Sequence, residues 1–272
     1  MRARWEQWVR FCDRPIDCRP LAMIRILVPL CVIGDLLQMA QLGLVTTFYR
    51  PQAIGGLVPA PHRWNVWDLS AEWGGLVTYG VTLVAMALVS VGFYSRISTI
   101  VAVAASANLA VLVPHSDRAI DDILRTVLLI LLFTNVHRCW SLTGKATKLT
   151  AGWPSDLLLT LLALIYMSAG VGKIMQNTDW VTMAGTPVLY RVMADPAGGN
   201  VDESAGMAWF GLFRILGLLT IVVECVGFLA WTRWRSWWAL TVAPIHIGIA
   251  MTMKLGMFSY GMLALYPVLF AP

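Results

Sequence analysis

Long apolar runs separated by short polar segments make up most of the chain from residue 21 onward. A helix needs about 20 mainly apolar residues to cross the hydrocarbon core of a membrane. The runs predict helices over residues 21–42, 75–93, 97–113, 119–134, 155–174 and 209–231, and two shorter ones within 237–270, broken near 254–256. The pattern therefore predicts an all-α, polytopic helical membrane protein with about eight transmembrane helices. Seven remain an alternative if the last two merge or one helix lies flat.

The composition agrees with this prediction, since 58% of the residues are hydrophobic and only 13% are charged. Soluble proteins are nearer half apolar and a quarter charged. No soluble domain is appended, so residues 1–272 are expected to form a single transmembrane domain. The sequence shows no internal repeat, which gives no support to a transporter built from inverted repeats.

The placement of charge predicts the orientation of the chain. The net charge is +5, and the basic residues cluster in short loops beside helix ends, as the positive-inside rule describes. We therefore expect both termini on the cytoplasmic side of the cell (inner) membrane, in a multi-pass protein that does not bind nucleic acid. Residues 1–20 carry five arginines and no small-residue cleavage site, so the first helix is expected to be retained.

Cysteine spacing supports neither a metal site nor a redox motif, because no C-x-x-C or Cys/His ligand spacing is present. Cys12 and Cys18 could pair or be free, and free thiols are the default on the cytoplasmic side. The other three, Cys31, Cys139 and Cys225, fall in or near separate predicted helices.

The two long loops, 45–73 and 175–208, are predicted to share the outer face of the membrane. The tryptophans in these loops and at the start of the helix that follows suit an aromatic belt or a lid. These are Trp64, Trp67, Trp73, Trp180 and Trp209.

Ionisable side chains inside the apolar runs are the candidate functional residues, since they are costly there. Asp121, Asp122 and Arg125 can share one helix face. They could form an intrahelical ion-pair group that lets Arg125 be buried. Alternatively, they could form a polar wall that binds a headgroup, a quinone or a peptide carboxylate.

Four further charges lie within predicted helices. Arg25 and Asp35 are ten residues apart on the first helix, roughly 15 Å along it, so they cannot bond each other. Arg214 and Glu224 are likewise ten residues apart on the sixth predicted helix, so they cannot bond each other either. We expect cross-helix pairs among these four, with Arg25 otherwise acting as an anchor that reaches the membrane surface.

Lys173 ends an apolar run, after Ala169, Gly170 and Gly172, whose small side chains let another helix or a flat ligand approach closely. It could simply reach the membrane interface, or it could be desolvated and act as a base. His246 follows Pro244, which loosens the backbone. It could be a hydrogen-bonded packing residue or take part in proton transfer.

The segment Tyr166-Met-Ser-Ala-Gly-Val-Gly-Lys-Ile, followed by Asp179-Trp180, resembles the central motif of vitamin K-dependent γ-glutamyl carboxylase. Other pieces agree in order, among them Pro20-Leu-Ala-Met-Ile-Arg-Ile and Gly92-Phe-Tyr-Ser-Arg-Ile-Ser. Over nearly its whole length the chain is similar to the HTTM (horizontally transferred transmembrane) family, the membrane half of that carboxylase.

The resemblance implies an enzyme in which Lys173 occupies the position of the lysine that deprotonates vitamin K hydroquinone. The implied cofactor is a reduced quinone of the vitamin K or menaquinone type, with molecular oxygen and carbon dioxide as co-substrates. Two positions depart from the family. Gly172 replaces the first of two adjacent lysines, and Ile120-Asp121-Asp122 stands where the carboxylase has its catalytic histidine.

Two functions follow from these observations. The first is a carboxylase-like or quinol-epoxidase-like membrane enzyme, with Lys173, Asp122 and His246 handling protons and no metal. Its candidate ligand-binding residues are Arg125, Asp121, Trp180 and Tyr166, and its substrate is an exported peptide. The second is a non-carboxylating module that matures or binds a secreted peptide toxin together with a soluble partner protein. Membrane lipid is the expected surrounding in both cases.

Overall fold

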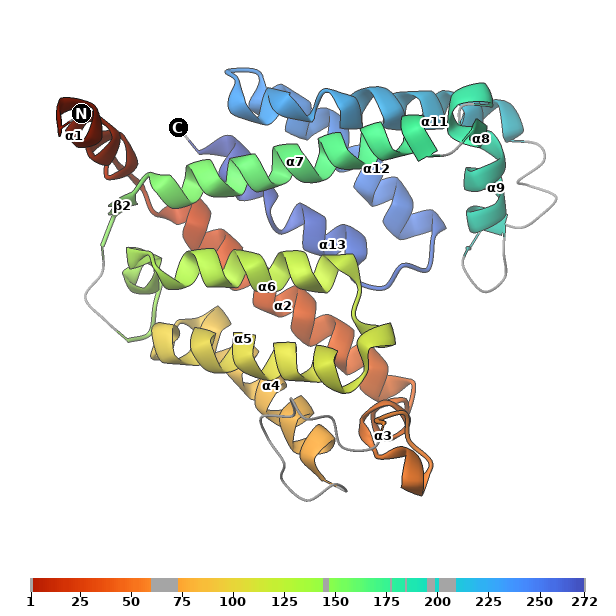
Figure 1. The fold of residues 1–272 in the computed structure, drawn as a ribbon, viewed down its shortest axis with the longest axis horizontal. Helices are drawn as coiled ribbons and strands as arrows, with labels where there is room; N and C mark the ends of the chain where they lie inside the picture. Colours follow the sequence, from red (N-terminus) through yellow and green to blue (C-terminus); the bar gives the residue numbers. More distant parts are fainter. Residues whose placement is uncertain are drawn as a thin grey trace. The chain divides into compact units, whose positions relative to one another are not determined.

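The computed structural model describes residues 2–59, 73–143, 147–176, 178–183, 185–194, 199–200 and 209–271 (Figure 1). The chain divides into two compact units. The first is Met1–Ser155 with Ala271–Pro272, and the second is Asp156–Phe270.

The first unit is a helical bundle in which α2 packs against α4 and α6, and α5 packs against α4 and α6. Its β-strands form one small antiparallel sheet. In chain order, its elements are α1 (Arg2–Cys12), β1 (Pro15–Asp17), α2 (Arg19–Gln41), α3 (Val45–Tyr49), η1 (Gln52–Ile54), α4 (Gly74–Val91), α5 (Ser95–Leu112), η2 (Pro114–Ser116), α6 (Ala119–Leu132), η3 (Asn135–Arg138) and β2 (Leu149–Ala151).

The second unit is also helical. In it, α12 packs against α11 and α13, and α9 packs against α8 and α11. Its elements are α7 (Trp153–Gln176, which begins in the last residues of the first unit), α8 (Thr178–Thr182), α9 (Thr186–Ala194), α11 (Phe210–Cys225), η4 (Gly227–Trp231), α12 (Arg235–Thr252), α13 (Phe258–Leu263) and η5 (Tyr266–Phe270).

The prediction of an all-α membrane protein is confirmed. Within the described residues, four helices, α2, α4, α5 and α7, are long and apolar enough to cross a membrane. They coincide with the predicted runs at 21–42, 75–93, 97–113 and 155–174. The predicted run at 119–134 is a helix of 14 residues, α6. The total of eight spans and the orientation of the termini stay predictions.

The predicted helix 209–231 is interrupted, because α11 ends at Cys225 and a 3-10 turn, η4, follows. Gly227 in this turn packs closely on α7. A Cβ added there would lie 3.0 Å from the Tyr166 Cβ and 3.1 Å from the Ala163 carbonyl oxygen. The predicted break near 254–256 is confirmed, since α12 ends at Thr252 and α13 starts at Phe258.

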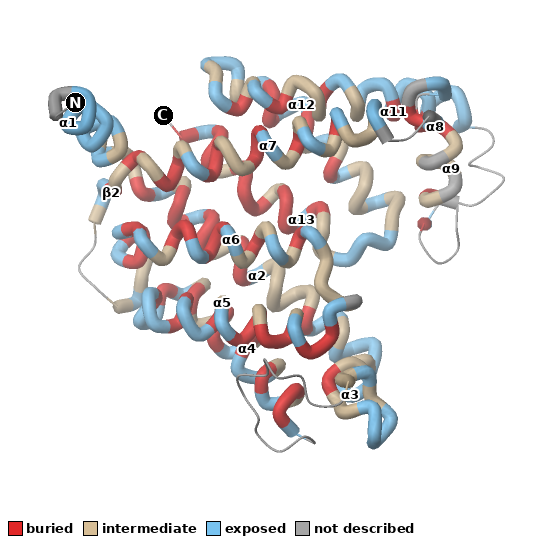
Figure 2. The backbone as a smooth tube through the Cα atoms, in the orientation of Figure 1, coloured by how far each residue is buried: buried red, intermediate tan, exposed pale blue. Residues whose placement is uncertain are grey.

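Buried and exposed residues alternate around the helices in both units (Figure 2). The exposed sides carry large apolar side chains, such as Val84 (57% exposed), Ile97 (63%) and Leu164 (60%). Such faces are unusual on a monomeric soluble protein, but they suit contact with lipid tails.

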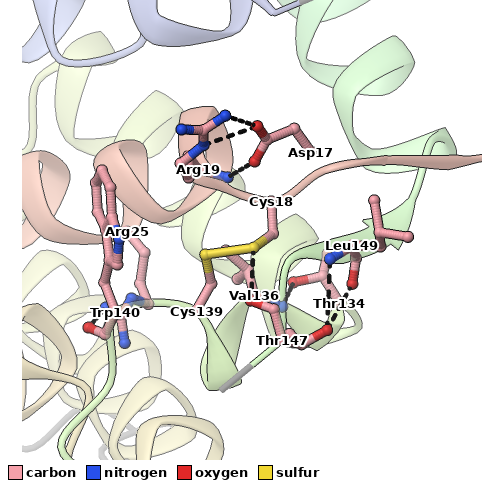
Figure 3. Close-up of a disulfide and its surroundings, with 10 residues drawn as sticks. All are labelled: Asp17, Cys18, Arg19, Arg25, Thr134, Val136, Cys139, Trp140, Thr147 and Leu149. Carbon is pink, nitrogen blue, oxygen red and sulfur yellow. Dashed lines mark hydrogen bonds and ion pairs between the residues drawn. A yellow bond between two sulfur atoms is a disulfide. The ribbon is translucent and has the colours of Figure 1, made fainter.

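A disulfide between Cys18 and Cys139 ties the start of α2 to the segment after η3 (Figure 3). Beside it, β1 pairs with β2, and the Cys18 N–H donates to the Lys148 carbonyl. The expectation that Cys18 is free or pairs with Cys12 was wrong, because its partner is Cys139. The two partners are 121 residues apart, and only the folded chain brings them together. Cys12, Cys31 and Cys225 are free thiols.

Candidate functional site

Lys173, near the end of α7, forms an ion pair with Glu224 of α11. Its Nζ donates to Glu224 Oε1 at 2.8 Å and to Oε2 at 2.6 Å. The two side chains are only 23% and 14% exposed. The amine therefore lies within the second unit, paired with a carboxylate that the sequence did not single out as its partner.

The close approach of α7 and α11 depends on Gly170, as its small size predicted. A Cβ at Gly170 would lie 2.8 Å from the Cys225 backbone nitrogen and 3.0 Å from the Glu224 Cβ. The neighbouring Gly172 differs, since an added Cβ there meets nothing within 4 Å. Gly170 is thus the residue that lets Glu224 reach Lys173.

Trp180 of α8 packs beside the same amine, with its ring centroid 5.3 Å from Lys173 Nζ, a distance at which a cation is attracted to the ring face. It is only 9% exposed. Trp180 is therefore not part of an exposed aromatic belt. Trp73 and Trp209 are exposed as expected, while Trp64 and Trp67 lie outside the described residues.

A buried hydrogen-bonded group joins three elements of the second unit. The Tyr166 hydroxyl of α7 lies 2.7 Å from His246 Nε2 of α12 and 2.7 Å from the Tyr266 hydroxyl of η5. The Trp238 ring meets the Tyr166 ring edge-to-face at 4.9 Å. His246 Nδ1 is buried and has no partner within the described part of the chain. The sequence pointed to Tyr166 and His246 separately but not to their contact, and it gave no signal for Tyr266.

Tyr166 and Lys173 are seven residues apart on α7, so they lie on the same helix face, about two turns from each other. This face thus carries a phenol bonded to an imidazole and an amine bonded to a carboxylate. All four groups can hold or pass a proton. Of the predicted catalytic residues, Lys173 and His246 belong to this unit, whereas Asp122 belongs to the first unit.

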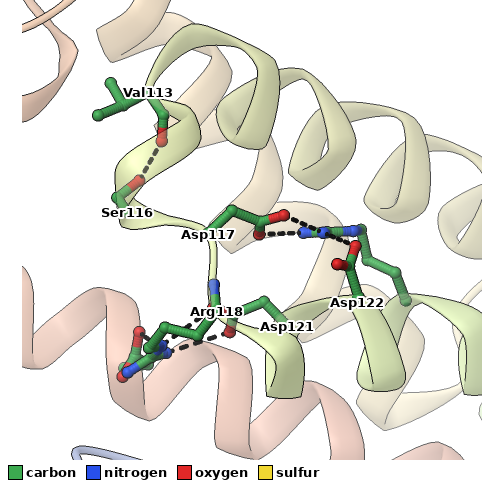
Figure 4. Close-up of polar contacts among 8 residues, drawn as sticks. Val113, Ser116, Asp117, Arg118, Asp121 and Asp122 are labelled. Carbon is green, nitrogen blue, oxygen red and sulfur yellow. Dashed lines mark hydrogen bonds and ion pairs between the residues drawn. The ribbon is translucent and has the colours of Figure 1, made fainter.

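In the first unit, two arginines bridge four aspartates around the start of α6 (Figure 4). Arg118 donates to Asp35 at 2.7 Å and to Asp121 at 3.0 Å. Arg125 donates to Asp117 through both terminal nitrogens, at 2.9 and 2.6 Å, and also to Asp122. The Asp122 side chain is 72% exposed.

These pairs correct two predictions. Arg125 does not pair with both adjacent acids, because Asp121 accepts the backbone N–H of Arg118 and so caps the first turn of α6. The cross-helix pairs expected among Arg25, Asp35, Arg214 and Glu224 do not form either. Asp35 pairs with Arg118, and Glu224 pairs with Lys173.

Arg25 does not reach the membrane surface as predicted, since it is only 1% exposed. Its Nη2 donates to the Trp140 carbonyl oxygen at 2.7 Å. Gly92, at φ +73°, leaves room for the guanidinium, because a Cβ there would clash with Nη1. Arg214 is exposed on α11.

Four helices able to cross a membrane, with apolar outer faces and buried ionisable groups, define a helical membrane protein. The chain belongs to the HTTM family, whose domain model matches residues 13–272. The HTTM domain is found in vitamin K-dependent carboxylase, so the resemblance drawn from the motifs is confirmed. No curated protein and no solved structure matches the chain.

Proposed function

We propose that the protein is a membrane enzyme related to the carboxylase, in which Lys173 and Glu224 exchange a proton during turnover. The observation that carries the proposal is the half-buried pair of the amine and the carboxylate, with a Nζ–Oε2 distance of 2.6 Å. At such a distance a proton can pass between the two groups. Glu224 would accept the proton of Lys173 and leave the amine free to act as a base.

The implied cofactor is a reduced quinone of the vitamin K or menaquinone type. When bound, it would supply hydroxyl groups that molecular oxygen can oxidise. The residues of the second unit fit such a molecule in two respects. Trp180 offers an aromatic ring beside Lys173, and His246 Nδ1 is a buried polar atom with no partner among the described residues. Lys173 would take a hydroxyl proton, and Tyr166 would keep the His246 ring in place.

The substrate that we propose is a glutamate-containing exported peptide, modified with carbon dioxide. A soluble partner protein would present this peptide from outside the membrane. In the first unit, Asp122 is proposed to handle protons. Asp121 and Arg125 are proposed to bind a ligand there.

The test is oxygen-dependent quinol oxidation by the full-length protein in lipid nanodiscs. Lys173→Ala and Glu224→Gln are each expected to lower the rate at least about 100-fold, the usual contribution of a positioned acid or base. Arg214→Gln, at an exposed position of α11, is the control and should keep the wild-type rate. Full activity of Lys173→Ala would contradict the proposal.

A second candidate function is a non-carboxylating module that matures or binds a secreted peptide toxin with partner proteins. The ion pair between Lys173 and Glu224 favours it, because Lys173 donates to both oxygens of Glu224. Such a pair can have a purely structural role in joining α7 and α11. In that case, peptide maturation would survive Lys173→Met and would require a partner protein instead.

A further inference from the structure

A small cavity lies within the first unit, beside the acidic cluster formed by Asp35, Asp117, Asp121 and Asp122. Its volume is about 70 Å³. One side is polar, with the carboxylates of Asp35, Asp117 and Asp121. The other side is apolar, with residues such as Leu36 and Leu128. Residues of α2, α3, α4, α5 and α6 contribute to the wall, so the fold itself forms the space.

Tyr49, the last residue of α3, is the polar group of this wall that lacks a partner. Its side chain is 96% buried, being only 4% exposed, and it lines the cavity. Its hydroxyl makes no hydrogen bond with any described residue, whereas the neighbouring Tyr79 hydroxyl donates to the Leu36 carbonyl at 2.7 Å. The hydroxyl is therefore available to a ligand in the cavity.

The surroundings of Tyr49 are negative. Burial first, and then Tyr79 and the carboxylates of Asp35, Asp121 and Asp117, raise the pKa of Tyr49 to about 12. The phenol is therefore neutral at physiological pH, and its oxygen can accept a hydrogen bond.

The charge balance of the cluster favours a cation over an anion. Four carboxylates share two guanidinium groups, so the cluster keeps a net negative charge. The guanidinium groups of Arg118 and Arg125 each already bond two carboxylates. Asp35 uses Oδ2 for Arg118, and its Oδ1 has no bond within the described part of the chain. Asp35 Oδ1 thus offers a free acceptor to a ligand that donates.

The size of the cavity admits a small cation. Its volume of about 70 Å³ is several times the roughly 10–15 Å³ that is needed to hold one water molecule. An ammonium group with one or two methylene groups can therefore enter it. A trimethylammonium group has no N–H to donate.

We propose that this cavity binds a primary ammonium group on a short alkyl stem, held by Tyr49 and Asp35. The ammonium would donate one hydrogen bond to the Tyr49 hydroxyl oxygen and one to Asp35 Oδ1, with its third N–H toward Asp117. The stem would contact the apolar wall. Two sources have this chemistry: the ethanolamine headgroup of a membrane phospholipid, and a free alkylamine.

The experiment measures thermal unfolding of the full-length protein by its tryptophan fluorescence. One arm compares nanodiscs of phosphatidylcholine with nanodiscs containing phosphatidylethanolamine. The other arm titrates ethylammonium chloride against tetramethylammonium chloride in phosphatidylcholine nanodiscs. The variants are Tyr49→Phe and Asp35→Asn. Tyr94→Phe, at an exposed tyrosine of the same unit, is the matched control.

We expect the wild type and Tyr94→Phe to be stabilised by the primary ammonium but not by the quaternary one. In Tyr49→Phe and Asp35→Asn the apparent affinity should fall about tenfold, the effect of losing a hydrogen bond to a charged group. Stabilisation by the lipid alone identifies the headgroup as the source, and stabilisation by ethylammonium alone identifies a free amine.

Equal stabilisation by both cations, no stabilisation by either source, or an unchanged affinity in Tyr49→Phe would overturn the proposal. The measurement requires no enzymatic activity. Its failure would therefore leave the function proposed for Lys173 untouched, and an inactive enzyme would leave the cavity proposal untouched.

Discussion

His137 shows how a single buried side chain can make the stability of the first unit depend on pH. Its Nε2 lies 3.0 Å from the Leu132 carbonyl oxygen, so this nitrogen carries the proton. Its Nδ1 therefore accepts from the Ser95 hydroxyl at 3.1 Å. Burial has the largest effect and lowers the pKa of His137. The hydrogen bond to Leu132 opposes it, and the nearby charges of Arg96 and Arg25 lower the pKa further. The folded protein thus holds this imidazole neutral.

We predict that the free energy of unfolding falls as the pH drops below about 6.5, the ordinary pKa of histidine. There the unfolded chain takes up a proton that folded His137 resists, so acid favours unfolding by up to about 1.4 kcal/mol per pH unit. Denaturant unfolding between pH 5 and 8 measures this for wild type and His137→Gln. The variant should have the shallower dependence. Parallel curves for the two proteins would show that His137 is not the group responsible.

At the scale of elements, the contact between α7 and α11 places Glu224 against Lys173. Two glycines of α7, Gly170 and Gly172, differ in how closely α11 approaches them. Gly170 faces the Cys225 backbone, whereas Gly172 faces open space. A side chain is therefore excluded at the first position and tolerated at the second.

We predict that Gly170→Ala destabilises the protein by about 1–3 kcal/mol, the usual cost of forcing an extra group into packed structure. The matched control, Gly172→Ala, should be neutral or stabilise by up to about 1 kcal/mol, because alanine favours the helix. Thermal unfolding in detergent compares the two. Equal midpoints would mean that α7 and α11 are not packed at Gly170.

At the scale of the whole molecule, the charge pattern and the disulfide point to different compartments for the end of the protein that holds Cys18 and Cys139. Basic loops predict the cytoplasm for this end, whereas disulfides are rare there. Both cysteines are buried, at 0% and 3% exposed, and a reductant must reach a sulfur atom to attack it. Burial of both sulfur atoms is expected to slow reduction of the disulfide.

We predict that three of the five cysteines react with a maleimide after denaturation without reductant, and all five after reduction. These three are the free thiols of the structure. Mass spectrometry of the intact protein counts the adducts, and Cys18→Ser with Cys139→Ser should give three under both conditions. Five adducts without reductant would show that the disulfide does not form.

The orientation itself is a separate prediction, drawn from the charges. A green fluorescent protein fused after Pro272 should fluoresce, because this reporter folds in the cytoplasm, and alkaline phosphatase fused there should be inactive. The opposite pair of results would place the C-terminus outside and reverse the assignment of the loops.

The sequence by itself determined the class of the protein, most of its helices and its family. Apolar runs are local signals, and the cost of burying backbone in lipid makes a helix of about 20 residues nearly obligatory. For the same reason the run at 155–174 and the break near 254–256 could be located from residue order alone. The motif around Lys173 is also a short stretch of sequence, so it could be recognised without the fold.

Only the tertiary structure decided which charges and thiols meet. Ion pairs and disulfides depend on distances between segments far apart in the chain, and charge alone does not choose among several available partners. Lys173 therefore pairs with Glu224, Asp35 with Arg118 and Cys18 with Cys139, none of which a pattern along the chain could select. The environment of the Tyr49 hydroxyl has the same origin, since Tyr49 lines a cavity together with residues of α2, α4, α5 and α6.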